Sequence, residues 1–285
     1  MTTPFRWDLS RRESLGHLVS GERPWSYREF QSDLLDCIPR VITQAQQSEL
    51  VFIGRSPESI FDLMSGLLAE TAWAPRLSLL NLSLRSLNAE ELRTLPVQRR
   101  ALRALLQDAG LSPMHLVRSK RPVAFIDLVY TGRTFSTLAG SLLDWGREAR
   151  IDADEMARRI RWIGVTEQGP TSPKTWRWQQ HWNYTQAFPP RVIRNVSIPS
   201  RLWTYLGDYQ PKVTVSSPPD SWRDPSLRTP PRDANQLSAL RLAWDLYMLG
   251  TARTTRLALA RRLARSDRMD ARWLRALVLE LKMKR

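Results

Sequence analysis

The chain has very few of the residues that build disulfides and metal centres. Cys37 is the single cysteine among 285 residues, and the three histidines are His17, His115 and His181. One cysteine excludes an internal disulfide and argues against a cysteine-based zinc site, and the histidines are too scattered to indicate a cluster. We therefore expect no protein-held metal ion. Cys37 follows an apolar stretch, which is typical of a buried structural thiol.

Long apolar segments are also lacking. The sequence has no N-terminal apolar region of the signal-peptide type and no run of about 18 apolar residues that could span a bilayer. This predicts a soluble, cytoplasmic protein without a membrane partner. Apolar residues still make up 42% of the chain, which is enough to build a hydrophobic core.

Acidic residues are scarce relative to basic ones. The chain has 28 Asp and Glu and 43 Lys and Arg, which gives a formal net charge of +15. Such a balance indicates polyanionic partners, whether phosphorylated metabolites, nucleic acid or both. More than half of the excess lies in residues 234–285, where 12 Lys and Arg stand against 4 Asp and Glu. We therefore expect a basic C-terminal unit.

Apolar runs alternate with helical periodicities through the middle of the chain. Strands are predicted over residues 50–54, 77–84, 122–127, 160–166 and 192–196. Helices are predicted over residues 57–70, 97–109 and 134–148, with one further short helix over 152–159. Alternating strands and helices with right-handed crossovers predict an α/β core, an open parallel sheet covered by helices, over residues 48–200.

Three other regions flank this core. Residues 1–47 are predicted as an N-terminal extension, loosely packed up to residue 25, followed by a helix that starts near Ser26 and breaks near Pro39. Residues 201–233, rich in tryptophan and proline, are predicted as a hood or a stiff linker. Residues 234–285 are predicted as a small bundle of three basic helices.

The segment from Val123 to Thr134, with the sequence VAFIDLVYTGRT, carries the most specific chemistry. It predicts a buried strand that ends at Asp127, followed by a short loop and a helix. Backbone N–H groups and hydroxyls around Thr131, Gly132 and Thr134 would then lie at a helix N-terminus, where a phosphate is favoured. Asp127 would lie at the carboxyl end of a strand, where open α/β sheets bind ligands, and could accept hydrogen bonds from sugar hydroxyls.

This segment resembles the phosphoribosyl pyrophosphate (PRPP) loop of type I phosphoribosyltransferases. Residues 128–134 are most similar to the pyrimidine-operon attenuator/uracil phosphoribosyltransferase group. The resemblance implies a sheet of type I phosphoribosyltransferase-like topology, with Asp127 on the ribose and Thr131, Gly132, Arg133 and Thr134 on the 5′-phosphate. The family carries two adjacent acids here, and Ile126 occupies the position of the first. Half of the family's contact with the ribose hydroxyls is then absent, which bears on turnover more than on binding.

Two upstream segments add candidates to the same site. Gly54, Arg55 and Ser56 follow an apolar strand and precede a helix start, at the place where the family binds pyrophosphate. An ordinary capped turn between a strand and a helix would give the same pattern. Arg85 follows the next strand, at a position where the pyrimidine group also carries an arginine, so it is a candidate phosphate contact, although exposed arginines are more often simply solvated.

The tryptophan-rich region and the C-terminal helices leave alternatives open. Aromatic side chains between Glu167 and Asp233 could fill a gap in the core, stack on a base in a small-ligand site, or stack on nucleic acid. The tryptophans to which these three alternatives apply are Trp176, Trp178, Trp182, Trp203 and Trp222. Arginines of the last helices could follow a phosphate backbone or be merely solvated; they are Arg253, Arg256, Arg261, Arg262 and Arg265.

Two functions are compatible with these patterns. The first is a PRPP-dependent phosphoribosyltransferase, in which a nitrogen base displaces pyrophosphate through an oxocarbenium-like state. Asp127, Arg55 and Arg85 would stabilise that state, and Mg²⁺ would arrive with the substrate. The second is a non-catalytic sensor or effector of the same fold, a regulatory or bacterial defence module that couples a phosphoribosyl or nucleotide ligand to a nucleic-acid or protein partner. Homo-oligomer formation is left open.

Overall fold

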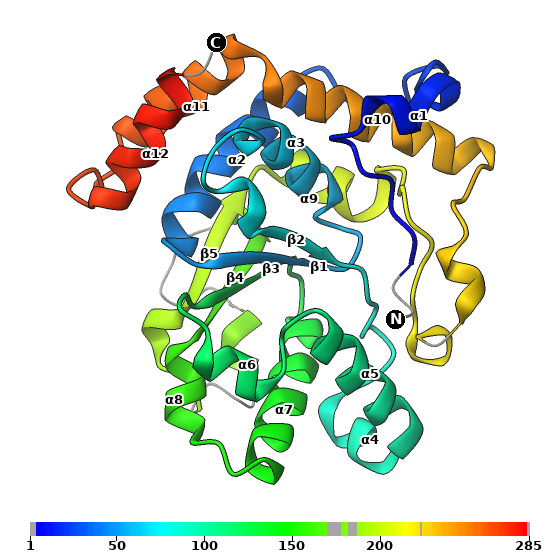
Figure 1. Ribbon diagram of the computed structural model, residues 1–285, viewed down its shortest axis with the longest axis vertical. Helices are drawn as coiled ribbons and strands as arrows, with labels where there is room; N and C mark the ends of the chain where they lie inside the picture. The colour runs from blue at the N-terminus through cyan, green and yellow to red at the C-terminus, as the bar shows by residue number, and fades with distance from the viewer. Residues whose placement is uncertain (1–3, 170–177, 182–186, 223, 284–285) are drawn as a thin grey trace.

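Five apolar segments form one parallel sheet at the centre of the molecule (Figure 1). The computed structural model describes residues 4–169, 178–181, 187–222 and 224–283. Its strands are β1 (Glu49–Ile53), β2 (Leu77–Leu80), β3 (Val123–Leu128), β4 (Ile160–Glu167) and β5 (Ile193–Ile198). They lie in the order β2-β1-β3-β4-β5, and all neighbours are parallel. The predicted α/β fold with an open parallel sheet is confirmed.

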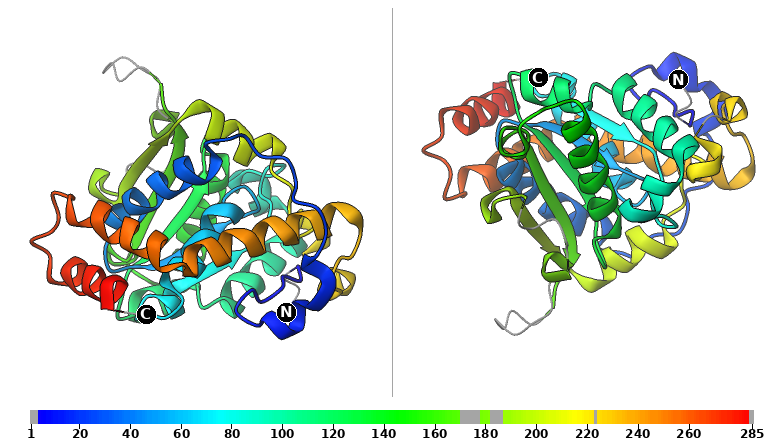
Figure 2. Two further views of the ribbon diagram at one scale, coloured as in Figure 1. Left: turned by 90° about the horizontal axis from the view of Figure 1, so that it is seen from above. Right: turned by 90° about the horizontal axis from the view of Figure 1, so that it is seen from below.

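Helices cover both faces of this sheet (Figures 1 and 2). One face carries α2 (Phe30–Ala45), α3 (Glu58–Leu68), α9 (Ser200–Thr204), α10 (Ala234–Thr251), α11 (Arg253–Ala264) and α12 (Arg272–Met283). The other carries α4 (Ala89–Thr94), α5 (Pro96–Asp108), α6 (Pro113–Arg118), α7 (Arg133–Glu148) and α8 (Ala153–Arg158). The short α1 (Arg12–Leu15) packs beside α10.

The central strands β1 and β3 are apolar on both faces, as a sheet between two helical layers requires. In β3, Ala124 and Ile126 belong to the apolar cluster beneath α2 and α3, whereas Val123 and Phe125 belong to the cluster beneath α5 and α7. Successive side chains of a strand point to opposite faces, so the continuous apolar run fills two cores at once.

The last three helices share a core with the sheet. Leu246 of α10, Leu259 of α11 and Leu277 of α12 are fully buried in the same cluster as the strands. The backbones of α3 and α10 meet at two glycines: a Cβ on Gly250 would lie 2.6 Å from the carbonyl oxygen of Leu63. These helices therefore cover one face of the sheet and are not packed apart from it.

The N-terminal segment is more ordered than the sequence indicates. For residues 4–25, the part of the predicted loose extension that the structure describes, the prediction is wrong, because Leu9, Leu15 and Val19 are buried against α10. This contact was not visible in the sequence because it depends on a helix more than 200 residues away, so local periodicity carries no sign of it.

The helix of residues 26–47 also differs from expectation. It begins at Phe30 and runs to Ala45 without a break at Pro39. Proline in a helix interior costs about 3 kcal/mol, because it removes a backbone hydrogen bond and crowds the preceding turn. Full burial of neighbours such as Ile38, Val41 and Ile42 offsets this cost.

Two further expectations on the elements need correction. The strand predicted over 77–84 ends at Leu80, because the following backbone pairs with a distant loop: Ser83 N–H donates to Ser217 O at 2.8 Å. The short helices α4 and α6 were not predicted.

Within the described ranges, no helix combines the length and the apolar character that crossing a bilayer requires.

Candidate functional site

The carboxyl ends of β1 and β3 lie side by side at the point where the chain changes direction. After β1 the chain enters α3 on one face of the sheet, and after β3 it enters α7 on the other. The strand order 2-1-3-4-5 is a common doubly wound arrangement, and ligands bind in the crevice at this switch point. A cavity of about 670 Å³ opens there.

All the candidate residues taken from the sequence line this cavity. They come from the β1 turn, the segment after β2, and the loop between β3 and α7. They are Gly54, Arg55, Ser56, Arg85, Asp127, Thr131, Gly132, Arg133 and Thr134. The fold therefore brings together three segments that are separated by up to 80 residues.

Asp127 is the buried carboxyl group of the cavity, with 8% of its surface exposed. Burial raises the pKa of Asp127 to about 8, against the smaller opposing effect of hydrogen bonds from Leu128 N–H and the Thr134 side chain. At neutral pH this side chain is therefore largely protonated in the free protein, and it can both donate and accept a hydrogen bond.

The loop after β3 ends where α7 begins. Gly132 is the N-cap residue of α7, with φ of +78°, a left-handed conformation that favours glycine. A Cβ at this position would lie 2.5 Å from Cε3 of Trp178. The missing side chain thus makes room for the Trp178 indole as well as shaping the cavity wall. The unpaired N–H groups of the first turn of α7 are suited to an anion.

Three arginines bring positive charge to the cavity from three segments. Arg55 Nη1 donates to Thr214 O at 3.3 Å, and Arg133 Nη1 donates to Arg85 O at 3.3 Å. Both contacts are to backbone carbonyls, so neither guanidinium charge is neutralised by them. The charge of these side chains is left to act on whatever occupies the cavity.

The sequence interpretation missed Lys212, which lines the same cavity. Its Nζ donates to Leu206 O at 2.7 Å, and burial lowers the pKa of Lys212 to about 8, with Glu58 opposing and Arg55 adding to this shift. Lys212 belongs to the 201–233 region, which has no periodicity that could have placed it. Other lining residues missed in that region are Gly207, Asp208, Ser216 and Ser217.

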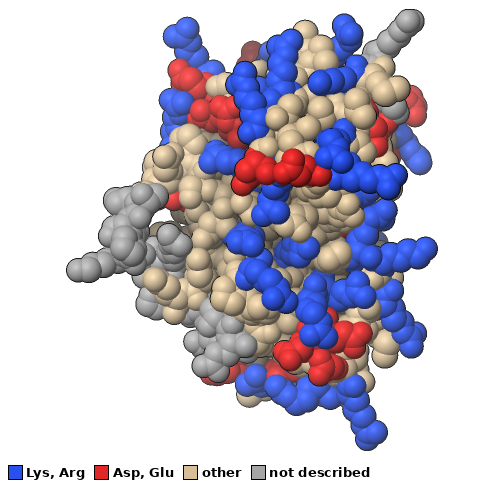
Figure 3. All heavy atoms as spheres, turned by 90° about the vertical axis from the view of Figure 1, so that its left-hand side faces the viewer, with Lys and Arg blue, Asp and Glu red and all other residues tan. Residues whose placement is uncertain are grey.

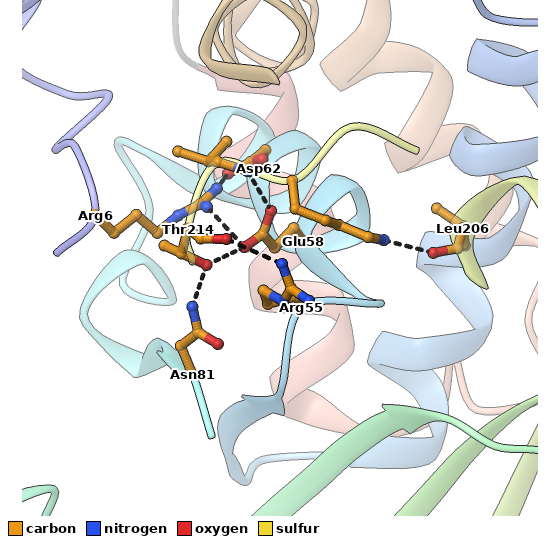
Figure 4. Close-up of polar contacts among 9 residues, drawn as sticks. Arg6, Arg55, Glu58, Asp62, Asn81, Leu206 and Thr214 are labelled. Atoms are coloured by element: carbon orange, nitrogen blue, oxygen red, sulfur yellow. Dashed lines mark hydrogen bonds and ion pairs between the residues drawn. The ribbon is translucent and has the colours of Figure 1, made fainter. Parts of the chain in front are cut away.

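A buried polar network lies next to the cavity and links the N-terminal segment, α3 and the loop around Thr214 (Figure 4). Arg6 lies between the carboxylates of Glu58 and Asp62, and its Nη1 is 3.4 Å from Glu58 Oε1. Glu58 also accepts a hydrogen bond of 2.7 Å from the hydroxyl of Thr214. Asn81 in turn contacts that hydroxyl. The N-terminal segment, α3 and the loop carrying Lys212 are thereby held in one arrangement.

The described tryptophans divide between packing and the cavity. Trp178 and Trp222 are buried, with exposed fractions of 2% and 1%, and belong to the cluster beneath α7. Trp203 lines the cavity and contacts Tyr130, with ring centroids 6.0 Å apart. Trp178 and Trp222 therefore fill the hydrophobic core, as one of the three alternatives predicted. For Trp203, stacking on a base stays a prediction. Trp176 and Trp182 lie outside the described residues.

Among the residues that the structure describes, no three His, Cys, Asp or Glu side chains converge on a common point that could hold a metal ion. Cys37 is buried in the core, and burial raises the pKa of its thiol to about 12. That environment keeps the thiol protonated and unreactive.

The chain matches no family model, no curated protein and no solved structure. The chemistry of the cavity therefore has to be inferred from its own residues and from their positions on the fold.

Asp127 should make the stability of the protein depend on pH. Its folded-state pKa of about 8 exceeds the ordinary 3.8, so between these values the folded state binds more protons and stability falls as pH rises. Asp127→Asn removes this titration. From pH 5 to pH 8 we expect the variant to gain on the order of 2–4 kcal/mol of unfolding free energy relative to the parent. Urea unfolding at both pH values measures the gain, and Asp154→Asn, at an exposed position, is the control. Equal pH profiles for Asp127→Asn and the parent would contradict the burial of a protonated carboxyl group.

Proposed function

We propose that the protein is phosphoribosyltransferase-like and binds a phosphoribosyl or nucleotide ligand in the cavity between β1 and β3. One observation carries the proposal: a single cavity joins the N-terminus of α7, three arginines, a lysine and one buried carboxyl group. An anion-binding helix end beside a carboxyl group suits a molecule that carries both a phosphate and sugar hydroxyls. The resemblance of Leu128–Thr134 to the PRPP loop supports the same ligand class.

In the enzymatic form of this proposal, the protein acts mainly by positioning and electrostatics. The base nitrogen forms a bond to C1 of the ribose while the bond from C1 to the pyrophosphate oxygen breaks, and the electron pair leaves with pyrophosphate. Arg55 and Arg85 would stabilise that leaving group, together with substrate-borne Mg²⁺. Asp127 would hold the ribose, and Thr131, Gly132, Arg133 and Thr134 would bind the 5′-phosphate.

A second function, a non-catalytic sensor or effector, is favoured by the position of Ile126. This residue is fully buried beneath α2 and α3, on the face of the sheet opposite that of Phe125. Ile126 supplies no polar group to the cavity, so no second acidic residue of β3 joins Asp127 in binding the ribose hydroxyls. Such a protein would bind the ligand without turnover and transmit occupancy to a nucleic-acid or protein partner.

Pyrophosphate release separates the two functions. The protein is incubated with PRPP, Mg²⁺ and a panel of nitrogen bases, and binding is followed in parallel by calorimetry. Release that depends on one base supports the transferase. Binding of PRPP or a nucleotide without release supports the sensor. If PRPP, ribose 5-phosphate and nucleotides all fail to bind, both functions are refuted.

Asp127→Asn is expected to weaken binding of PRPP or ribose 5-phosphate. Above its pKa of about 8 the Asp127 carboxylate is ionised, and at such a pH the loss of a charge-assisted hydrogen bond to the ribose costs about 1.5 kcal/mol or more, which is roughly a tenfold rise in Kd. Calorimetry on the variant measures this change, after a melting curve has shown that it folds like the parent. Asp154→Asn removes the same charge outside the cavity and should leave Kd unchanged. Unchanged affinity in a folded Asp127→Asn protein would remove Asp127 from the site.

A further inference from the structure

Three arginines gather at the amino edge of the sheet, on the side opposite the cavity. Arg161 is the second residue of β4 and Arg194 is the second residue of β5. Arg268, between α11 and α12, lies close enough to Arg161 for its charge to act on that side chain. Arg194 pairs with Ile163, two residues after Arg161. Residues two apart point to the same face of a strand, so Arg161 and Arg194 are diagonal neighbours on the face covered by α2 and α11.

None of these three arginines forms an ion pair with a carboxylate in the described part of the chain. Arg161 is half-buried, and its Nη2 donates to Gln46 Oε1 at 3.1 Å, while its Nε is buried without a hydrogen-bond partner among the described residues. Burial lowers the pKa of Arg161, and the charges of Arg194 and Arg268 lower it further; no described carboxylate is among the groups that shift it. Like charges held together in this way cost free energy, which a bound anion would relieve.

The arginines that the sequence nominated for a phosphate backbone are less suitable. Arg256 is 7% exposed in its side chain and lies 3.4 Å from Glu70, and Arg262 lies 2.7 Å from Asp36. Both have carboxylate partners within the protein. The helix stripe from 253 to 265 is therefore partly neutralised, whereas the group at the edge of the sheet is not.

We propose that Arg161, Arg194 and Arg268 form a phosphate-binding site that takes the backbone of a nucleic acid. Guanidinium groups bind phosphate oxygens in pairs, and three of them from separate segments make a site that one flexible side chain could not. Figure 3 shows Lys and Arg side chains spread widely over the side of the molecule that carries α11 and α12, with acidic groups confined to small clusters. So broad a basic face fits an extended polyanion better than a single small anion. This site is independent of what occupies the cavity.

The test uses the full chain and a variant with Arg161→Gln, Arg194→Gln and Arg268→Gln. Its matched control carries Arg11→Gln, Arg100→Gln and Arg147→Gln, exposed arginines outside both the group and the cavity. Binding of labelled single-stranded and duplex oligonucleotides is measured by fluorescence anisotropy over a salt series. For the variant we expect a loss of about tenfold or more in affinity, and a salt slope for single strands reduced by about 2, at roughly 0.7 for each lost phosphate contact.

Inorganic phosphate provides the second arm. If phosphate raises the Tm of the parent and the control but not of the variant, while oligonucleotide binding is unaffected, the site is upheld and its occupant is a free phosphate group. The single variant Arg268→Glu, in a loop, repeats both measurements should the triple variant fail to fold. Equal oligonucleotide binding and equal phosphate effects in the parent, control and Arg268→Glu or triple variant overturn the proposal.

Discussion

Gly66→Ala is expected to lower the free energy of unfolding by about 3 kcal/mol or more, because the added methyl group overpacks a contact between two helix backbones. A Cβ at Gly66 would overlap the carbonyl oxygen of Tyr247 in α10, and Cα of Gly250 lies 3.1 Å from the same position. A backbone atom in the middle of a helix cannot move aside as a side chain can. α3 and α10 would have to separate, which opens the cluster that contains Leu63, Leu67 and Leu246.

Urea unfolding measures this loss, and Gly21→Ala serves as the control. A Cβ at Gly21 meets nothing within 4 Å, so that variant should keep the parent's stability. If Gly66→Ala were as stable as Gly21→Ala, α10 could not be packed on α3 in the way described. The C-terminal helices would then have to be regarded as a separate unit.

Ile126→Asp is expected to destabilise the protein by several kcal/mol and not to create a second ribose contact. The side chain of Ile126 is fully buried among Phe52, Ile163 and their neighbours, away from the face that holds Phe125. A carboxylate there would have no partner, and burial without one costs about 3–5 kcal/mol or more. The new carboxyl group would escape part of this cost by staying protonated.

Thermal melts at two pH values test the Ile126 prediction. Because the folded state would hold the proton, Ile126→Asp should be least impaired near pH 4 and lose stability as pH rises. Ile126→Val, which removes one methylene group, should cost only about 1 kcal/mol at either pH. A stable Ile126→Asp protein with increased PRPP affinity would show instead that this position reaches the cavity.

The central strands β1 and β3 were predictable from the sequence because each is a short apolar run buried on both faces. Segments such as Val123–Ile126 need no distant partner to be recognised, and the alternation with helices then indicates a parallel sheet. The end of β2 was not predictable. The alternation of Leu80, Leu82 and Leu84 continues past the strand, and only the pairing of Ser83 with Ser217 shows that the ladder stops.

The candidate site was predictable where a strand leads directly into it. Asp127 and Thr131–Thr134 follow β3, and Gly54–Ser56 follow β1, so the rule that parallel strands present their carboxyl ends together brings them to one cavity. Lys212 was not predictable in this way. It reaches the cavity from an irregular segment whose path is set by contacts of Thr214 with Glu58 and Asn81, none of them local in sequence.

The path of the chain has a consequence for its folding during synthesis. The apolar surface of α3 is complete once residue 68 has been made, but its cover, α10, begins only at Ala234. Side chains such as Leu63 and Leu67 therefore stay exposed until about 170 more residues have been added. At typical synthesis rates of about 5–20 residues per second, this takes roughly 10–30 s. Throughout that interval the nascent chain carries an uncovered apolar surface on α3, and it is then that chaperones would be needed most to prevent aggregation.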